Sequence, residues 1–241
     1  MRVPRIFTDQ PLAEGQTVAL EEAPSRHLGK VLRMTAGREV LVFNGQGGEH
    51  LGRIVSVEKK AVTLELTDFD PQDRESPLDL ELAIGVSRGD RMDWVLQKAT
   101  ELGVSRITPL FTERTEVKLK GERLEKKLSH WRQVIVSACE QCQRNRLPSL
   151  ADPATLGSWL DNAPAGRRFV LHHRDSKGLP AEEALTQVSL LVGPEGGLSD
   201  EEIEQARAAG CEPLTLGPRV LRTETAPVAA VSLAQYLWGD W

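Results

Sequence analysis

Two glycine-proline segments near the C-terminus constrain the fold of this chain more than any other feature. They are residues 193–197, with the sequence GPEGG, and residues 216–226, with the sequence LGPRVLRTETA. Each follows a short apolar run that is typical of a strand, and each precedes a helical pattern. Because glycine has no side chain, the backbone at a strand exit can approach a ligand closely. We therefore predict two walls of one pocket, at the C-terminal edge of an open α/β sheet.

The residues after position 77 alternate between strand and helix patterns. The predicted strands cover residues 78–86, 107–111, 169–172, 188–192 and 213–216, and the predicted helices include 90–102, 124–145 and 225–238. This alternation favours a mainly parallel α/β sheet. The helix over 225–238 is almost entirely apolar, which predicts that it is buried in the core or in a subunit interface.

The first 70 residues follow a different pattern. Short β-branched runs at 40–43, 54–57 and 62–66 predict strands, and one helical pattern over 25–34 interrupts them. Together they predict a small barrel-like domain. A polar stretch with two prolines over 70–77 is typical of a linker, so we divide the chain into domains at 1–72 and 73–241.

Carboxylates follow the first glycine-proline segment and restrict its ligand. Ser199 and Glu202 fit a capping box, the first turn of that helix holds three carboxylates, and Glu195 adds a fourth. A helix start that binds phosphate offers bare N–H groups and positive potential, so a neutral or cationic ligand fits this one better. The alternative is an ordinary capped helix after a tight turn. The glycine fingerprints of nucleotide sites are also missing from the sequence.

Composition and cysteine usage argue against several other classes. Apolar residues make up 40% of the chain, no run of 18 occurs, and the N-terminus lacks a signal-peptide stretch, so we expect a soluble cytoplasmic protein. Cys139 and Cys142 have C-x-x-C spacing, but they lie inside a helical pattern, which favours reduced thiols over a redox or zinc site. His172 and His173 lack a nearby third ligand, which argues against a metal.

The net charge of −5 hides an asymmetry along the chain. Basic residues outnumber acidic ones over 88–146, and acidic residues outnumber basic ones over 147–241. Because the local field matters more than the total, an acidic protein can still bind nucleic acid. Arg144 and Arg146 flank the end of a predicted helix without acidic neighbours in the sequence, whereas the other charges interleave as on a solvated helix face.

The two glycine-proline segments, extended to residues 193–199 and 216–226, resemble the RsmE family of 16S ribosomal RNA uridine N3-methyltransferases, which belong to the SPOUT class. The resemblance covers the whole length and includes residues 5–7, 27–33, 97–103 and 138–144. It implies an N-terminal PUA-like β-barrel for RNA and a C-terminal SPOUT α/β domain with a trefoil knot. It also implies S-adenosyl-L-methionine as cofactor, a homodimer, and 16S ribosomal RNA within the small ribosomal subunit as partner.

The resemblance assigns roles to individual residues. The residues implied to bind the cofactor are Leu171, His172, Gly193, Pro194, Glu195, Gly196, Gly197, Leu216, Gly217, Val220, Leu221, Arg222, Thr225 and Ala226. The residues expected to bind RNA are Arg5, Arg26, Lys30, Arg33, Lys98, Arg114 and Arg144. Since N3 of uridine carries a proton at neutral pH, Glu224 is a candidate base and Arg222 a candidate for stabilising the developing charge. The alternative for both is a structural ion pair that shapes the loop.

Three other functions stay open. A non-catalytic RNA-binding module would not need two glycine-rich loops. A nicotinamide-dependent oxidoreductase would need the missing fingerprint. A SPOUT enzyme that acts on a transfer RNA base or a ribose 2′-hydroxyl is the strongest alternative, because the pocket residues specify the cofactor better than the acceptor.

Overall fold

The computed structural model describes residues 3–172, 178–181 and 184–241, and the chain in it divides into two compact units. Unit 1 comprises residues 1–75 and 139–147, and unit 2 comprises residues 76–138 and 148–241. The first division lies three residues beyond the domain boundary that we predicted after residue 72. The return of 139–147 to unit 1 corrects the assignment of all residues after 72 to one domain.

Unit 1 is built on a five-stranded sheet in the order β1-β3-β4-β5-β2. Its strands are β1 (Arg5–Phe7), β2 (Thr17–Ala19), β3 (Glu39–Phe43), β4 (Glu49–Val57) and β5 (Val62–Asp70). Only β1 and β3 pair in parallel; the other neighbours are antiparallel. Alternate residues of these strands, such as Val40, Val42, Leu64 and Leu66, form the core of the unit.

The predicted helix over 25–34 differs from the structure. A short helix, α1 (Glu22–Arg26), passes into a π-helical turn, η1 (His27–Val31). Leu28 is fully buried, but Val31 and Leu32, which lie three and four residues further along the helical pattern, are exposed. The wider π-helical turn changes the angular spacing of the residues that follow it, so a pattern counted at 3.6 residues per turn fails here.

Unit 2 contains a parallel sheet in the order β12-β10-β11-β6-β7-β8, with β9 also pairing with β7. Its strands are β6 (Asp79–Gly85), β7 (Arg106–Phe111), β8 (Ser149–Leu150), β9 (Ala154–Thr155), β10 (Arg167–Leu171), β11 (Gln187–Val192) and β12 (Glu212–Leu214). Every pairing in this sheet is parallel, which confirms the prediction from the strand–helix alternation.

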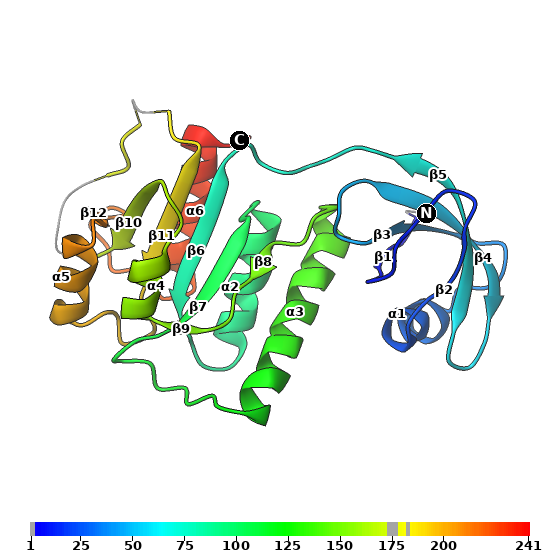
Figure 1. Ribbon diagram of the computed structural model, residues 1–241, viewed down its shortest axis with the longest axis horizontal. Helices are drawn as coiled ribbons and strands as arrows, with labels where there is room; N and C mark the ends of the chain where they lie inside the picture. The colour runs from blue at the N-terminus through cyan, green and yellow to red at the C-terminus, as the bar shows by residue number, and fades with distance from the viewer. Residues whose placement is uncertain (1–2, 173–177, 182–183) are drawn as a thin grey trace. The chain divides into compact units, whose positions relative to one another are not determined.

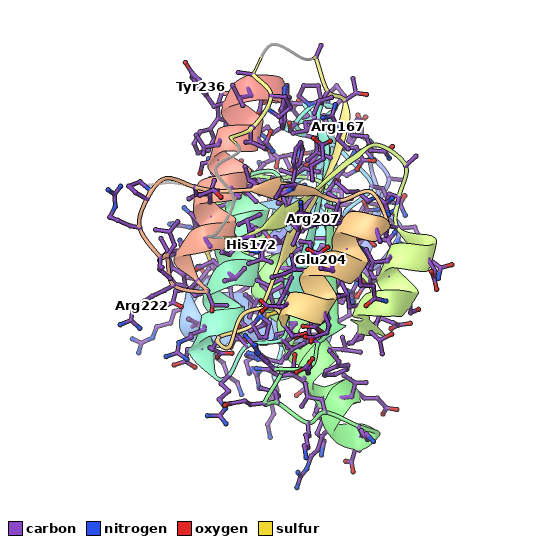
Figure 2. The ribbon with its side chains drawn as sticks, turned by 90° about the vertical axis from the view of Figure 1, so that its left-hand side faces the viewer. Arg167, His172, Glu204, Arg207, Arg222 and Tyr236 are labelled. Atoms are coloured by element: carbon purple, nitrogen blue, oxygen red, sulfur yellow. The ribbon has the colours of Figure 1, made fainter. Side chains whose placement is uncertain are left out.

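Helices cover both faces of this sheet (Figure 1). They are α2 (Asp90–Glu101), α3 (Glu122–Cys142), α4 (Leu156–Asn162), α5 (Asp200–Ala208) and α6 (Thr225–Trp238). Figure 2 shows α4 and α5 on one side of the strands and α6 on the other. The residues of α4 and α5 share a hydrophobic core with β7, β10 and β11, while α6 contacts α2 and β11.

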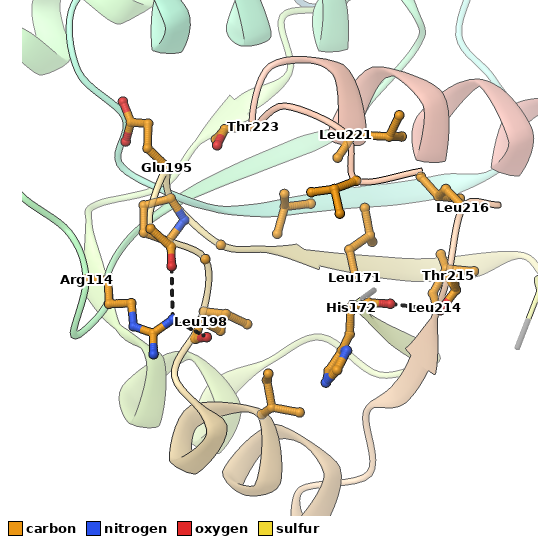
Figure 3. Close-up of a pocket in the computed structure, with 18 of the residues that line it drawn as sticks. Arg114, Leu171, His172, Glu195, Leu198, Leu214, Thr215, Leu216, Leu221 and Thr223 are labelled. Carbon is orange, nitrogen blue, oxygen red and sulfur yellow. Dashed lines mark hydrogen bonds between the residues drawn. The ribbon is translucent and has the colours of Figure 1, made fainter. Parts of the chain in front are cut away.

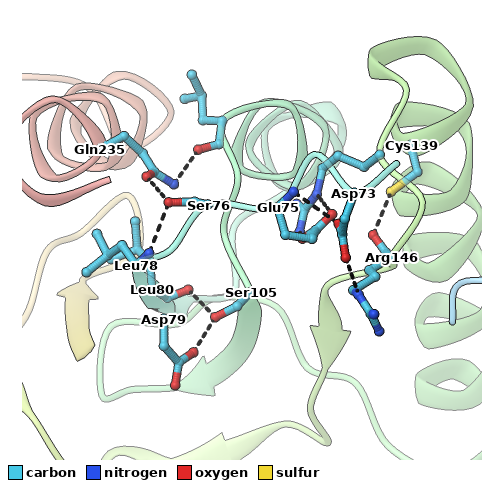
Figure 4. A network of polar contacts seen from close by, with 12 residues as sticks. Asp73, Glu75, Ser76, Leu78, Asp79, Leu80, Ser105, Cys139, Arg146 and Gln235 are labelled. Carbon is cyan, nitrogen blue, oxygen red and sulfur yellow. Dashed lines mark hydrogen bonds and ion pairs between the residues drawn. The ribbon is translucent and has the colours of Figure 1, made fainter. Parts of the chain in front are cut away.

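The last helix, α6, is buried along one face. Ala230, Val231 and Ala234 are fully buried within unit 2, whereas Leu233 and Tyr236 stay exposed. The side chain of Gln235 is also buried; it donates from Nε2 to the Leu102 carbonyl at 2.8 Å and accepts from the Ser76 hydroxyl at 2.6 Å (Figure 4). This face therefore belongs to the core, and only the other face is available to a partner.

Two arginines that we expected to bind RNA are structural residues of unit 1. Arg5 is buried and donates to the Glu49 carboxylate at 2.9 Å and to the Cys139 carbonyl at 2.8 Å, so it caps the last turn of α3. Arg144 is also buried, and its Nε donates to Glu75 at 3.0 Å. Burial and internal partners leave neither side chain accessible to a phosphate, so both assignments are corrected.

The predicted linker over residues 70–77 is bonded to residues 139–147, the second segment of unit 1. Arg146 Nε donates to the Asp73 carboxylate at 2.8 Å (Figure 4), and the Asn145 side chain donates to the Gln72 carbonyl at 2.8 Å. The acids that the sequence did not show near Arg144 and Arg146 are therefore Glu75 and Asp73, about seventy residues earlier in the chain.

Candidate active site

A pocket with a cavity volume of about 310 Å³ lies where β10, β11 and β12 end (Figure 3). Both glycine-proline segments line it, which confirms the prediction of two walls. Twelve of the residues expected to bind a cofactor line it: Leu171, His172, Gly193, Pro194, Glu195, Gly196, Gly197, Leu216, Gly217, Val220, Leu221 and Ala226. Position at the C-terminal ends of parallel strands is the usual location of ligand sites in such sheets.

The first wall, residues 193–197, is a tight turn after β11. The Gly197 amide donates to the Pro194 carbonyl at 2.8 Å, and Gly197 has φ = +69°, a conformation that favours glycine. Gly193 is required for space, because a Cβ on it would lie 2.8 Å from the amide nitrogen of Leu198. Pro194 packs closely on the end of β6, because a Cβ added to Gly85 would lie only 2.5 Å from Pro194 Cδ.

Arg114 braces this wall from the loop after β7. Its Nη1 donates to the carbonyl of Gly196 at 3.0 Å and to that of Leu198 at 3.3 Å (Figure 3). We expected Arg114 to bind RNA. The structure shows that it lines the pocket and holds the turn; its role toward RNA stays a prediction.

The second wall begins where β12 ends. The His172 amide donates to the Leu214 carbonyl at 2.9 Å, and the Thr215 hydroxyl donates to the His172 carbonyl at 2.8 Å. The strand covers residues 212–214 where we predicted 213–216, and residues 215–217 and 219–221 line the cavity. Gly217 has φ = +74°, and a Cβ on it would meet no protein atom within 4 Å.

The carboxylates after the first wall include the capping box that the sequence predicts. The capping box of α5 is present: Ser199 Oγ accepts from the Glu202 amide at 3.3 Å, and Glu202 Oε2 accepts from the Ser199 amide at 3.0 Å. Glu202 Oε1 also accepts from the Glu113 amide at 2.8 Å. The capping box therefore occupies the Glu202 amide in the first turn of α5, and the carboxylates of that turn make its N-terminus unfavourable for phosphate, while Asp200 lines the cavity.

Glu195 and Glu224 both pair with Arg91 of α2. Arg91 Nη1 lies 3.2 Å from Glu195 Oε1, and Arg91 Nε lies 3.9 Å from Glu224 Oε2. Although partial burial acts to raise it, the pKa of the Glu195 carboxyl is lowered by hydrogen bonds, including that from the Arg88 amide, and by Arg91. Figure 3 shows this carboxylate turned away from the cavity. The acidic character that we predicted for the pocket is thus partly neutralised.

Two of the expected residues do not line this cavity. Arg222 is exposed and its side chain points away from the unit (Figure 2), while its carbonyl accepts from the amides of Thr225 and Ala226 at 2.9 Å. Thr225 lines a second cavity instead, against α6. Sequence reasoning missed these lining residues: Val192, Leu198, Asp200, Ile203, Leu214, Thr215, Arg219 and Thr223. Most of them adjoin the two segments, so proximity in the chain was the available signal.

The remaining RNA-binding candidates lie on the surface of their own units. Arg26, Lys30 and Arg33 are exposed on and just after the α1–η1 segment of unit 1. Lys98 in α2 is half-buried and pairs with Glu101 at 2.9 Å. None of these contacts removes the side chains from solvent, so a role in RNA binding stays a prediction for them.

The thiols and histidines show no metal-binding arrangement in the described part of the chain. Over residues 3–172, 178–181 and 184–241, no group of three metal-binding side chains converges. Burial raises the pKa of the Cys139 thiol to about 12, so it is not a nucleophile at neutral pH. His173 lies outside the described residues. None of the described helices combines the length and apolar character needed to span a bilayer.

Two protein-family models match the sequence. An RNA methyltransferase domain matches residues 74–235, and an RNA methyltransferase PUA domain matches residues 20–67. A ribosomal RNA small subunit methyltransferase E from Buchnera aphidicola subsp. Schizaphis graminum is 33% identical, over 99% of this chain and 98% of the relative. The Bacillus subtilis protein of the same name is 30% identical, over 95% and 94%.

Solved structures are also similar over their full length. A putative methyltransferase from Legionella pneumophila, in complex with bound S-adenosylmethionine, has a TM-score of 0.96 and 42% identity, with both chains covered completely. A ribosomal RNA small subunit methyltransferase E from Neisseria gonorrhoeae, bound to S-adenosylmethionine, has a TM-score of 0.91 and 38% identity, again with complete coverage.

Proposed function

Because this chain belongs to the ribosomal RNA small subunit methyltransferase E family, we propose that it transfers a methyl group from S-adenosyl-L-methionine to N3 of a uridine in 16S ribosomal RNA. The observation that carries the proposal is the pocket itself, in which two glycine-proline walls enclose a cavity at the ends of parallel strands. The Legionella and Neisseria proteins, which share its fold, hold S-adenosylmethionine.

The residues of the pocket fit this cofactor. Buried apolar side chains, among them Leu198 and Leu214, offer a surface for the adenine base. The α5 N-terminus is capped, which suits a ligand without phosphate. No protein atom lies within 4 Å of a Cβ built on Gly197 or Gly217, so space beside both backbones is open. When bound, the cofactor supplies an electrophilic methyl group on a cationic sulfonium.

The chain supplies positioning and proton handling. Uridine N3 must lose its proton before or during methylation, and Glu224 stands beside the lining residue Thr223 as the candidate base. Arg222 is exposed between the lining residues Leu221 and Thr223, where it can reach an RNA base and stabilise charge on the flanking carbonyl oxygens. Holding donor and acceptor in line supplies much of the acceleration in a displacement of this kind.

The two units have separate tasks in this proposal. Unit 1, the PUA-like unit for which the family resemblance implies a barrel, binds RNA phosphates through Arg26, Lys30 and Arg33. Unit 2, with a trefoil knot, binds the cofactor. The last helix, α6, follows the second wall and packs on α2 and β11. The enzyme acts in the cytoplasm on RNA of the small ribosomal subunit.

We also propose a homodimer that covers the exposed face of α6. A cavity of about 540 Å³ lies between α6 and the second wall, and apolar residues such as Leu216, Leu233 and Leu237 line it. Leu233 is 44% exposed and Tyr236 is 69% exposed. Contiguous apolar surface of this kind favours a subunit contact. Val231 of the same helix is fully buried in unit 2 and is not part of this proposed interface.

Mapping of the methylated nucleoside tests the proposed reaction. The purified protein and labelled S-adenosylmethionine are incubated with one RNA substrate at a time: 16S ribosomal RNA, assembled small subunits or transfer RNA. The products are identified by mass spectrometry. We expect 3-methyluridine in 16S RNA or in the small subunit. A 2′-O-methylated ribose or a methylated transfer RNA base would instead establish the alternative acceptor.

The variant Gly197→Val tests the assignment of the first wall to the cofactor site. Its φ of +69° is strained for a β-branched residue, so cofactor binding measured by calorimetry should be lost while circular dichroism stays native. Unchanged affinity would contradict the assignment of the first wall.

A further inference from the structure

Arg91 connects the two walls of the pocket, although it does not line the cavity itself. It lies in the first turn of α2, 3.2 Å from Glu195 of the first wall and 3.9 Å from Glu224 at the end of the second. The Arg91 side chain is 45% exposed, while those of Glu195 and Glu224 are 27% and 25% exposed. One guanidinium therefore bridges two loops that are about thirty residues apart in the sequence.

The position of Arg91 in the first turn of α2 explains why it needs acidic partners. A positive side chain in the first turn of a helix is opposed by the helix dipole, so this position needs nearby acids. Asp93, an acid of the same first turn, pairs with Lys127 at 3.2 Å and with His130 at 2.6 Å. Arg91 is thus left to the two carboxylates of the pocket loops.

Glu195 fixes the start of α2 at the same time. The helix begins after Gly89, which has φ = +55° and offers no side-chain cap. Glu195 Oε1 accepts from the Arg88 amide at 2.8 Å, just before that N-terminus. The same carboxylate oxygen thus joins the first wall to the Arg88 backbone and to the Arg91 guanidinium, so the first wall is bonded to the start of α2 at two points.

The shape of the arginine side chain matters for the bridge. Arg91 Nη1 donates to Glu195 at 3.2 Å, while Nε of the same planar group lies 3.9 Å from Glu224, an ion-pair contact without a hydrogen bond. A lysine would present a single ammonium, which can keep one of these contacts but not both geometries. Glu224 has no side-chain capping bond at the start of α6, so Arg91 is its described ion-pair partner.

We infer that Arg91 is a positioning residue: it sets the spacing between the two walls and the orientation of Glu224. This inference rests on the proposed function for its catalytic consequence, because Glu224 is the candidate base. Its structural part, the tie between the loops, is independent of any ligand.

The test compares Arg91→Ala and Arg91→Lys with a matched control, Arg88→Ala. Arg88 is an exposed arginine three residues away whose side chain pairs with Glu116, and the control keeps the backbone amide that Glu195 uses. All variants are first compared in amide hydrogen exchange without cofactor or RNA. The reporters are the amides of Thr225 and Ala226, which are bonded to the Arg222 carbonyl in the first turn of α6.

In Arg91→Ala we expect these amides to exchange about two- to fivefold faster, the scale of a partly exposed ion pair, with a smaller effect in Arg91→Lys and none in Arg88→Ala. Equal exchange in Arg91→Ala and the wild type would overturn the tie. Equal acceleration in Arg88→Ala would show that only local charge matters, and would overturn it as well.

The catalytic part is measured as a single-turnover rate at saturating cofactor and RNA. We expect Arg91→Ala to be slower by about tenfold or more, since small misplacements of a reacting group cost one to two orders of magnitude. Combined with Glu224→Gln, the loss should be non-additive. Additive losses, or a changed RNA KM at unchanged rate, would overturn the positioning role. Absence of methylation by the wild type would refute the proposed function instead, and leave the exchange result to stand.

Discussion

Gly85 offers the sharpest test of how the first wall is held. It is the last residue of β6, it does not line the pocket, and its backbone faces the turn of the first wall. A Cβ at this position would lie 2.5 Å from both the nitrogen and Cδ of Pro194, and 3.0 Å from the carbonyl carbon of Gly193. Ordinary contacts begin at 3.4 Å, so Gly85→Ala must move the turn or the strand by about 1 Å.

The atoms that would have to move decide the size of the effect. They belong to the backbone and to a proline ring, so no side-chain rotation relieves the overlap. Overpacking of this kind costs about 1–3 kcal/mol, which corresponds to a melting temperature lower by roughly 2–12 °C. Displacement of the wall by about 1 Å should also weaken S-adenosylmethionine binding by about five- to thirtyfold, since it would break one or two contacts of about 1 kcal/mol each.

The assay pairs thermal unfolding with calorimetric titration of the cofactor. Gly157→Ala in α4 is the matched control, because its new Cβ would meet only the flexible Gln205 side chain, at 3.3 Å. We expect the control to keep both its melting temperature and its affinity, or to gain slightly in stability from helix propensity. A Gly85→Ala protein with wild-type stability and wild-type affinity would refute the close packing of the first wall on β6.

Three further predictions concern the two units separately. Arg5→Ala should lower the free energy of unfolding of unit 1 by about 3–5 kcal/mol in denaturant titrations, because it leaves the buried Glu49 carboxylate unpaired; a loss below 1 kcal/mol would contradict its structural role. Alanine at Arg26, Lys30 and Arg33 together should raise the RNA KM and reduce the salt slope of binding by about two to three, at unchanged cofactor affinity. Leu233→Glu with Tyr236→Glu should give monomers by light scattering; a variant that stays dimeric would exclude this face.

The sheet of unit 2 and the pocket walls were predictable because their signals are local. An apolar run such as 188–192 identifies a buried strand without knowledge of its neighbours. The glycines after it leave the backbone accessible to a ligand, whatever the position of the strand in the sheet. The capping box of α5 is local as well, since Ser199 and Glu202 are three residues apart and satisfy each other's amides. These features needed no tertiary contact to be recognised.

The errors arise where a charged residue finds its partner far along the chain. Arg5 looked like a free basic residue because Glu49 and the end of α3 are 44 and 134 residues away. Gly85 has no motif around it; its need for glycine appears only when Pro194 packs against it. Arg91 was missed for the same reason, and Glu224 could be either a base or a structural ion-pair partner in the sequence. The structure shows the ion pair, and since Arg91 holds the carboxylate rather than removing it from the second wall, the two roles are compatible: the contact that shapes the loop is also the one that would orient a base.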